Sequence, residues 1–343
     1  MREHASYKSA EAHALLVANG DRSHVGAHLM ASAGASPLTL LDTRAAWEGP
    51  SLVRRLLYHF AGKRPTRLCS FSGRVAALGG SGRFTHVITT GIAPVTARAL
   101  AGLRARGVCT VNFLTDDPWN PANGAAHFWS SLLQYDVVFS PRSANLEELR
   151  AYGCRDVRYL PFAYNPAEHF AETAASAEER AKYACDVTFI GGADAQRVEL
   201  LGPLLASGLR CHLYGGYWEG YAATRAHARG MVLERDYRLA VSGARVNICM
   251  GRLANRDGHA MRSYELPAMG AALVVEDTAE HRALFGQEGV SVLYYQNAQN
   301  LAAQVTRLCS DDTLRTRLAS AVVQRVATEA NTYAARLRTM LAV

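Results

Sequence analysis

The sequence is poor in lysine, in paired cysteines and in long apolar runs. Only three of its 37 basic residues are lysines, Lys8, Lys63 and Lys182, and the rest are arginines. Its seven cysteines are scattered, odd in number and without a C-x-x-C pair, so we expect free buried thiols rather than disulfides or a zinc site. No apolar run approaches the roughly 20 residues that span a bilayer, and Ala14–Ala18 is too short for a signal peptide. We therefore expect a cytoplasmic protein.

Two kinds of binding motif are also missing. No G-x-G-x-x-G follows Ala14–Ala18 or Val187–Ile190, which argues against a dinucleotide-dependent dehydrogenase. No basic cluster with interleaved aromatic residues occurs, so we expect no nucleic-acid binding. The net charge of +7 comes from arginine. It indicates a codon bias of the genome, a preference for phosphate-bearing partners, or a basic face toward an anionic membrane and hence peripheral membrane association.

Length and pattern predict two α/β domains. A chain of 343 residues exceeds one ordinary core, and short apolar runs alternate with longer amphipathic ones, as in βα units around parallel sheets. In the first half we predict strands over Ala14–Ala18, Leu38–Leu41, Thr85–Thr89, Val108–Phe113, Asp136–Phe139 and Val157–Leu160, and helices over His24–Ala33, Ser51–Ala61, Pro94–Arg106, Ala125–Gln134 and Ser143–Tyr152. We predict a first Rossmann-like domain over residues 1–164, a linker with at most one surface helix over 165–184, and a second Rossmann-like domain over 185–343.

The second half repeats the pattern. We predict strands over Asp186–Ile190, Leu209–Tyr214, Arg245–Met250, Leu273–Val275 and Val290–Tyr295, and helices over Gln196–Ala206, Tyr237–Ser242, Ala298–Cys309 and Asp312–Leu341. We expect the end of the last helix, near Thr328–Leu341, to cross back to the first domain. In such sheets ligands bind outside the carboxyl ends of the strands, so the loops after the strands, including Gly191–Asp194 and Gly251–His259, are the candidate binding segments.

Two glycines follow the first strand of the second half. Gly191 and Gly192 let the backbone approach a phosphate, and Arg197 in the next helix is placed to reach a diphosphate. The alternatives are a tight turn that needs positive φ and a solvated arginine. Nearby, aromatic residues around Gly215-Gly216 either sandwich a nucleobase or pack in the core; they are Tyr214, Tyr217 and Trp218.

The most specific stretch runs from Asp257 to Asp277. Asp257 and Glu265 lie eight positions apart, and carboxylates accept pairs of hydroxyl hydrogen bonds, as a ribose or a hexose offers. Pro267 is tolerated near the start of a helix but not deep inside one, so we predict that a helix begins close to Arg262–Tyr264. Arg262 would supply a counter-charge to a diphosphate; the alternative is an ordinary ion pair between Arg262 and Glu265.

These segments carry a resemblance to a known family. The run Asp186-Val-Thr-Phe-Ile-Gly-Gly, Arg197, the run Met261-Arg-Ser-Tyr-Glu-Leu-Pro-Ala-Met-Gly-Ala and Glu276-Asp-Thr resemble the C-terminal half of the CgeB-like, spore-maturation-type glycosyltransferases, which are similar to group-1 glycosyltransferases of GT-B fold. Thr115-Asp-Asp-Pro-Trp119 and Leu160–Pro166 resemble parts of the first half. The resemblance implies an α/β fold of two Rossmann-like domains facing a cleft, with the acceptor in the first domain and the donor in the second.

The resemblance also implies roles for single residues. Glu265 matches the acid that binds the nucleotide ribose, and Asp257 matches the first acid of the E-x7-E pattern, near the donor sugar, although it is Asp rather than Glu. Gly258 and His259 match the loop whose backbone faces the sugar and the β-phosphate. Arg262 matches an arginine of the donor site. The fold family binds the diphosphate without a metal, so we expect no metal site.

Two adjacent acids follow a strand of the first half. Asp116 and Asp117 are candidates for the general base that an inverting transferase needs on the acceptor hydroxyl. The alternative is turn chemistry, because Asp-Pro pairs favour turns; a metal bound by both acids is a weaker third interpretation. His24 and His86 are spare candidates for the base.

Together these features predict a metal-independent glycosyltransferase that uses a nucleoside-diphosphate sugar, most simply a UDP-sugar. Its acceptor would be a glycan, a lipid-linked glycan, a protein or a small molecule. The alternatives are a sugar-nucleotide epimerase or hydrolase of the same fold, and a non-catalytic protein that binds sugar nucleotides or glycans.

Overall fold

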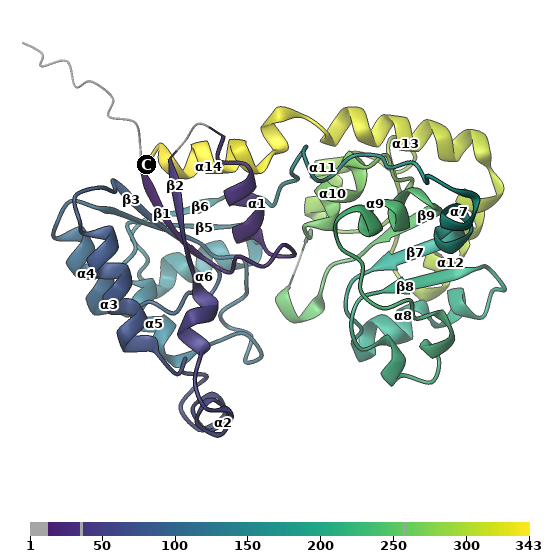
Figure 1. Cartoon of the computed structure of the whole chain (residues 1–343). Helices are drawn as coiled ribbons and strands as arrows, with labels where there is room; N and C mark the ends of the chain where they lie inside the picture. The colour runs from purple at the N-terminus through teal and green to yellow at the C-terminus, as the bar shows by residue number, and fades with distance from the viewer. Residues whose placement is uncertain (1–12, 35–36, 257) are drawn as a thin grey trace, which may run out of the picture. The chain divides into compact units, whose positions relative to one another are not determined.

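The computed structural model describes residues 13–34, 37–256 and 258–343. The chain forms two compact units. The first unit takes in the chain up to Pro161 together with Ala254–Arg256 and Tyr333–Val343, and the second unit takes in Phe162–Leu253 and Asp257–Thr332. Figure 1 shows each unit as a twisted sheet with helices around it.

The first unit contains a six-stranded parallel sheet. Its strands are β1 (Ala14–Ala18), β2 (Leu38–Asp42), β3 (His86–Thr90), β4 (Cys109–Phe113), β5 (Val137–Ser140) and β6 (Val157–Tyr159). They lie in the order β2-β1-β3-β4-β5-β6, so the order reverses between β1 and β3. Every strand predicted from the alternating pattern of this half is confirmed within two residues at each end.

The first unit has seven helices in its described part. They are α1 (Val25–Ala31), α2 (Ser51–Phe60), α3 (Leu68–Gly79), α4 (Ala97–Arg104), α5 (Ala126–Leu132), α6 (Ser143–Tyr152) and α14 (Tyr333–Leu341). All of them except α2 contribute buried residues. We did not predict α3, although its buried Leu68, Phe71 and Val75 follow helical spacing. Side chains of α3, α4 and α5 pack with those of the sheet in one apolar core.

The second unit contains a five-stranded parallel sheet. Its strands are β7 (Cys185–Ile190), β8 (Cys211–Tyr214), β9 (Ala244–Cys249), β10 (Leu273–Glu276) and β11 (Leu293–Tyr295). They lie in the order β11-β10-β9-β7-β8. Strand β7 therefore lies between the next two strands of the sequence, as β1 does in the first unit. Both sheets reverse their strand order beside their first strand, and ligands bind at such points in open α/β sheets.

The helices of the second unit are α7 (Ala177–Tyr183), α8 (Ala195–Leu205), α9 (Glu234–Ser242), α10 (Arg262–Ala268), α11 (Ala279–Phe285), α12 (Ala298–Ser310) and α13 (Asp312–Val326). Short 3-10 turns over Trp218–Gly220, Arg225–His227, Leu253–Asn255 and Glu329–Asn331 join some of these elements, and another over Thr43–Trp47 lies in the first unit. None of the helices in the described part of the chain combines the length and the apolar character needed to cross a bilayer.

Two of the predicted segments differ from the structure. The single helix expected over Asp312–Leu341 is divided into α13 and α14, because the Asn331 side chain donates to the Val326 carbonyl and ends the first of them. The segment 165–184, expected as a linker, is part of the second unit. Its Glu172 forms an ion pair with Arg238 at 2.9 Å, so charge pairing joins a stretch that was predicted as a linker to the second unit.

Candidate functional site

The loops after β7 and β9 meet at the point where the strand order of the second unit reverses. Phe189 pairs with Ile248 in the sheet, and this register brings Gly192 level with Gly251 beyond the strand ends. Because both loops leave the carboxyl edge of the sheet, they form the place where a ligand would bind in this topology. We call this place the switch-point site and define it by Gly191, Gly192, Gly251 and the side chains around them.

Arg197 holds the two loops of the switch-point site together. Its Nη1 donates to the Gly192 carbonyl at 2.8 Å and its Nη2 donates to the Gly251 carbonyl at 2.9 Å. The side chain is buried, with its guanidinium 5.2 Å from the centre of the Phe189 ring. Burial lowers the pKa of Arg197, and the nearby Arg252 adds to this effect. Two of its donors serve backbone carbonyls, which gives Arg197 a structural role, and the expectation that it reaches a diphosphate stays a prediction.

A close approach of backbone between the Gly191-Gly192 loop and the next one requires a glycine at position 215. A Cβ on Gly215 would lie 2.3 Å from the Gly191 carbonyl oxygen, and Gly215 has a φ of 122°. The indole Nε1 of Trp218 donates to the same carbonyl at 2.8 Å. The two glycine loops therefore pack on each other, but neither Gly191 nor Gly192 has a positive φ, so the interpretation of a tight turn that needs one is wrong. Gly192 still lies at the open edge of the sheet.

The aromatic residues near these glycines divide into two groups. Tyr214 and Trp218 are 3% and 0% exposed and belong to the core, so they are not free to sandwich a base. Tyr217 is 80% exposed and takes a left-handed backbone conformation with a φ of 75°. Of the three, Tyr217 alone has its ring at the surface.

The N-terminus of α8 is already occupied. Asp194 caps it, because its Oδ1 accepts a hydrogen bond from the Arg197 backbone N–H at 2.9 Å. The carboxylate accepts from a helix N–H and interacts with the positive end of the helix dipole, both of which a phosphate would otherwise use. A diphosphate at the switch-point site therefore depends on cationic side chains more than on this helix.

Helix α10 carries Arg262 and Glu265, and it begins at Arg262 as Pro267 predicts. Glu265 is 0% exposed. Its Oε2 accepts from the Tyr237 hydroxyl at 2.9 Å and from Arg262 Nη1. The part-exposed Arg262 also donates to the Ile190 carbonyl at 3.3 Å and lies over the Tyr237 ring. Burial raises the pKa of Tyr237 well above its ordinary value, so this phenol stays a donor to Glu265.

The Glu265 side chain is fully buried, and its binding to a ribose stays a prediction. The ion pair between Arg262 and Glu265, which was the alternative, is present, and it is buried at the carboxylate rather than on the surface. The acid and Tyr237 together fix the direction of the Arg262 guanidinium. Asp257, its expected partner acid, lies outside the described residues.

Gly258 and His259 precede α10 and are tied to the start of α11. The Thr278 hydroxyl donates to the Gly258 carbonyl, and a Cβ on Gly258 would lie 1.8 Å from a carboxylate oxygen of Glu280. The His259 ring is 3% exposed and packs edge-on against Phe162 and Tyr264. The His259 ring is therefore packed in the core, and a role of its backbone toward a ligand stays a prediction.

A buried network supports this loop from behind. The Ser263 hydroxyl accepts from the Ala260 N–H at 3.0 Å and lies 2.8 Å from His281 Nε2, while His281 Nδ1 lies 2.8 Å from the Glu276 carbonyl oxygen. The carbonyl can only accept, so Nδ1 carries the proton and Nε2 accepts from Ser263. Burial lowers the pKa of His281 to about 4, which keeps the ring neutral.

Arg252 is a residue of the switch-point site that we did not single out from the sequence. It is exposed, and a Cβ on Gly192 would lie 3.5 Å from its Nη2. No carboxylate pairs with it among the described residues. Its position could have identified it, because Arg252 lies two residues after the end of a predicted strand and within the candidate binding segment Gly251–His259.

Asp116 and Asp117 lie beyond β4 in the first unit, in different surroundings. Asp117 is 1% exposed; its carboxylate accepts from Arg256 Nε at 2.7 Å and from Asn145 at 2.9 Å. Burial raises the pKa of Asp117, but the hydrogen bonds from Arg256 and Asn145 outweigh this effect and leave it below its usual range. A carboxylate held in this way is a weak base, so the turn interpretation fits Asp117.

Asp116 points to the neighbouring loop. A Cβ on Gly91 would lie 2.7 Å from its Oδ2, and Gly91 has a φ of 59°. This glycine follows β3, at the reversal of strand order in the first sheet. Asp116 is therefore one acid near the switch point of the first unit, and Asp42, beside Gly20 after β1, is another. His86 begins β3 and so lies at the opposite edge of the sheet, which removes it as a spare base.

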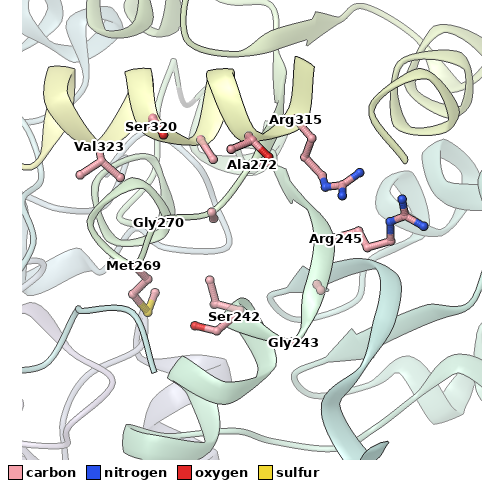
Figure 2. A pocket seen from close by; sticks show the side chains of 14 residues that line it. Ser242, Gly243, Arg245, Met269, Gly270, Ala272, Arg315, Ser320 and Val323 are labelled. Atoms are coloured by element: carbon pink, nitrogen blue, oxygen red, sulfur yellow. The ribbon is translucent and has the colours of Figure 1, made fainter. Parts of the chain in front are cut away.

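A cavity of about 470 Å³ opens at the other edge of the second sheet. Figure 2 shows that Arg245 and Arg315 lie at one end of it, beside Ala272 and the helix that carries Ser320 and Val323. Both arginines contact Asp312 Oδ1, at 2.7 and 2.8 Å. Because it lies at the amino end of β9, this cavity is separate from the switch-point site.

Comparison with known proteins agrees with this arrangement. Residues 196–342 match the family model described as glycosyl transferase-like. A search of curated proteins finds no match in sequence. Among solved structures, sucrose-phosphate synthase from Thermosynechococcus elongatus is 14% identical with a TM-score of 0.65, covering 95% of this chain and 98% of its own. Anabaena HepE, solved with UDP, is 12% identical with a TM-score of 0.62, covering 96% and 99%.

A third structure carries a different description. The putative UDP-N-acetylglucosamine 2-epimerase from Listeria monocytogenes is 12% identical with a TM-score of 0.54, covering 96% of this chain and 95% of its own. These likenesses extend over both units, and their sequence identities are low enough that they speak for architecture alone. The chain has the GT-B fold, with two Rossmann-like α/β units.

Proposed function

We propose that the protein is a glycosyltransferase of the CgeB-like kind that takes its sugar from a nucleoside diphosphate. The observation that carries the proposal is the switch-point site of the second unit. There Arg197 donates to carbonyls of the loops after β7 and β9, beside the exposed Arg252. The match to the glycosyl transferase-like family, over residues 196–342, covers most of this unit and includes Arg197 and Arg252. A UDP-sugar is the expected donor, because HepE of the same fold was solved with UDP and with UDP-glucose.

Two cations would bind the diphosphate in this proposal. Arg252 is exposed beside Gly192, and Arg262 is directed by Glu265 and Tyr237. A guanidinium group can bind two phosphate oxygens at once. The positive charge of both arginines would stabilise the negative charge that develops on the leaving diphosphate. No metal is needed for this step, so activity should persist in EDTA.

The bond changes follow from an inverting scheme. Asp116 would take the proton of the acceptor hydroxyl, the freed oxygen would attack the anomeric carbon, and the nucleoside diphosphate would leave with the bonding electrons. Asp117 would keep the Asp116 loop in place through its ion pair with Arg256. A retaining scheme would not need Asp116. The acceptor is a glycan, a lipid-linked glycan, a protein or a small molecule.

The test begins with a thermal-shift panel of nucleoside diphosphates and their sugars, since a bound ligand raises the unfolding temperature. Arg252→Gln should weaken UDP binding roughly 10- to 100-fold, the value of a lost charge-assisted hydrogen bond or two. Arg307→Gln is the matched control, because Arg307 is exposed near the end of α12. Equal weakening in both variants, or none in either, would count against the site.

A second comparison decides the role of Glu265. If its carboxylate directs Arg262, Glu265→Gln should weaken UDP and 2′-deoxy-UDP by the same factor. If it binds the ribose, as its match to the family implies, the parent should prefer UDP and Glu265→Gln should lose that preference. Isothermal titration with both nucleotides distinguishes the two outcomes.

An epimerase or hydrolase of the same fold is the second candidate, and its support is the likeness to the putative UDP-N-acetylglucosamine 2-epimerase. Such an enzyme would consume the donor with no acceptor present, whereas a transferase would need an acceptor. A non-catalytic binding protein would show ligand stabilisation and no turnover under either condition. Chromatography of the nucleotide products, with and without an acceptor mixture, separates the three.

A further inference from the structure

Helix α2 is an amphipathic helix that its own unit leaves uncovered. None of its ten residues is buried. Leu52, Leu56 and Phe60 recur at every fourth position and are 67%, 48% and 84% exposed, and Val53 adds to the same face at 41%. A helix of a globular unit normally turns such a face into the core. Figure 1 shows α2 at the margin of the first unit, apart from its other helices.

The opposite face of α2 is basic. Arg54, Arg55 and His59 lie on it, beside Ser51 and Tyr58, and the helix has no acidic residue. The sequence has no acidic residue at all between Glu48 and Asp116, a span that holds ten arginines and lysines. Acids from outside this span pair with two of the ten, Arg67 with Glu48 and Arg104 with Asp136. Among the described residues no acid pairs with Arg54 or Arg55 of α2, which favours an anionic partner over an uncharged one.

The helix is held firmly at its C-terminal end. A Cβ on Gly62 would lie 2.5 Å from the Ala126 Cβ, and the Ala126 N–H donates to the Gly62 carbonyl at 2.9 Å. Lys63 Nζ donates to the Ala122 carbonyl at 2.6 Å. The exposed face is therefore presented by a fixed anchor, so it is a built surface rather than a loose segment.

We propose that α2 docks the protein on an anionic lipid bilayer. The apolar face over Leu52, Leu56 and Phe60 would enter the headgroup region, and Arg54 and Arg55 would lie among lipid phosphates, as in helices that lie in the plane of a membrane. The positive charge of α2 favours an anionic bilayer over a second copy of this chain. A symmetric contact between two copies would bring two basic helices together, and they would repel each other. This inference does not depend on the proposed sugar transfer.

Vesicle flotation of the full chain tests the proposal. Phosphatidylcholine vesicles alone and equimolar phosphatidylcholine and phosphatidylglycerol vesicles serve as probes. Binding is expected only with phosphatidylglycerol, and it should weaken with added salt. Leu52→Ser with Phe60→Ser, and separately Arg54→Gln with Arg55→Gln, should each weaken it roughly tenfold or more. Because none of these side chains is buried, circular dichroism should show unchanged folding.

Matched controls lie on α3 of the same unit. Leu78→Ser and Arg74→Gln replace exposed residues of the same types, and vesicle binding should stay at the parent level. Phe60→Trp adds a depth probe, whose emission should shift to the blue and be quenched by brominated lipid. Absence of binding to phosphatidylglycerol vesicles, equal loss in the α3 controls, or a Phe60→Trp emission that stays unchanged would each overturn the proposal. So would loss of a dimer in the Leu52→Ser, Phe60→Ser variant without loss of vesicle binding.

Discussion

Replacing Arg197 by methionine separates the two roles that this arginine could have. Methionine keeps the apolar length of the side chain over Phe189 but removes the donors to the Gly192 and Gly251 carbonyls. Each charge-assisted hydrogen bond contributes about 1.5–3 kcal/mol. We therefore expect the opening of these loops to become easier by about 3 kcal/mol, which is roughly a 100-fold loss of amide protection.

Hydrogen–deuterium exchange read by mass spectrometry measures this change segment by segment. The exchange of peptides over residues 190–198 and 249–253 should accelerate, while peptides from the first unit should keep their rates. Arg307→Met, which removes an exposed arginine of α12, should change local protection by less than about 0.5 kcal/mol. Unchanged exchange in Arg197→Met together with a large loss of UDP affinity would refute the reasoning, because Arg197 would then contact the ligand itself.

Three further predictions address glycine, histidine and aspartate. Gly215→Ala places a Cβ 2.3 Å from a carbonyl oxygen at a φ of 122° and should lower stability by about 2 kcal/mol or more in urea unfolding, whereas Gly216→Ala, with open space around it, should be nearly neutral. His281 has a folded pKa of about 4 against 6.5, so its stabilising effect should be complete above pH 6.5 and should fall by about 3 kcal/mol as the pH drops to 4; His281→Gln should flatten that dependence in melts across this range. Asp117→Asn should destabilise the first unit by about 1–3 kcal/mol, while Asp116→Asn should keep the melting temperature and slow transfer at least about 100-fold.

Most helices and strands could be predicted from short stretches of the sequence. The start of α10 followed from Pro267, because proline restricts a helix whatever surrounds it. The strands followed from short apolar runs, since a parallel sheet buries both faces of each strand. The division between α13 and α14 was missed, because it depends on one side chain, Asn331, turning back to a carbonyl.

Contacts between distant segments set the limits of prediction at the site. The Gly251 carbonyl that receives Arg197 is 54 positions away, and Arg256 is 139 positions from Asp117. Charge and spacing identify arginines and acids that can bind a ligand, but they do not show which ones the fold has already paired. Glu265 illustrates this point: its position was predicted well, and its burial under Tyr237 and Arg262 was not.

The discontinuity of the first unit has a consequence for biosynthesis. Its sheet and most of its helices are translated first, yet α14 packs on α1, with the Tyr333 ring stacked 5.3 Å from the His28 ring, and Arg336 donates to the Pro161 carbonyl. Residues Tyr333–Leu341 emerge from the ribosome only after the whole second unit. Domains fold largely in the order of their synthesis, but here the unit that is made first is completed last. Until Tyr333–Leu341 is made, the side of α1 that carries His28 stays without its α14 contact.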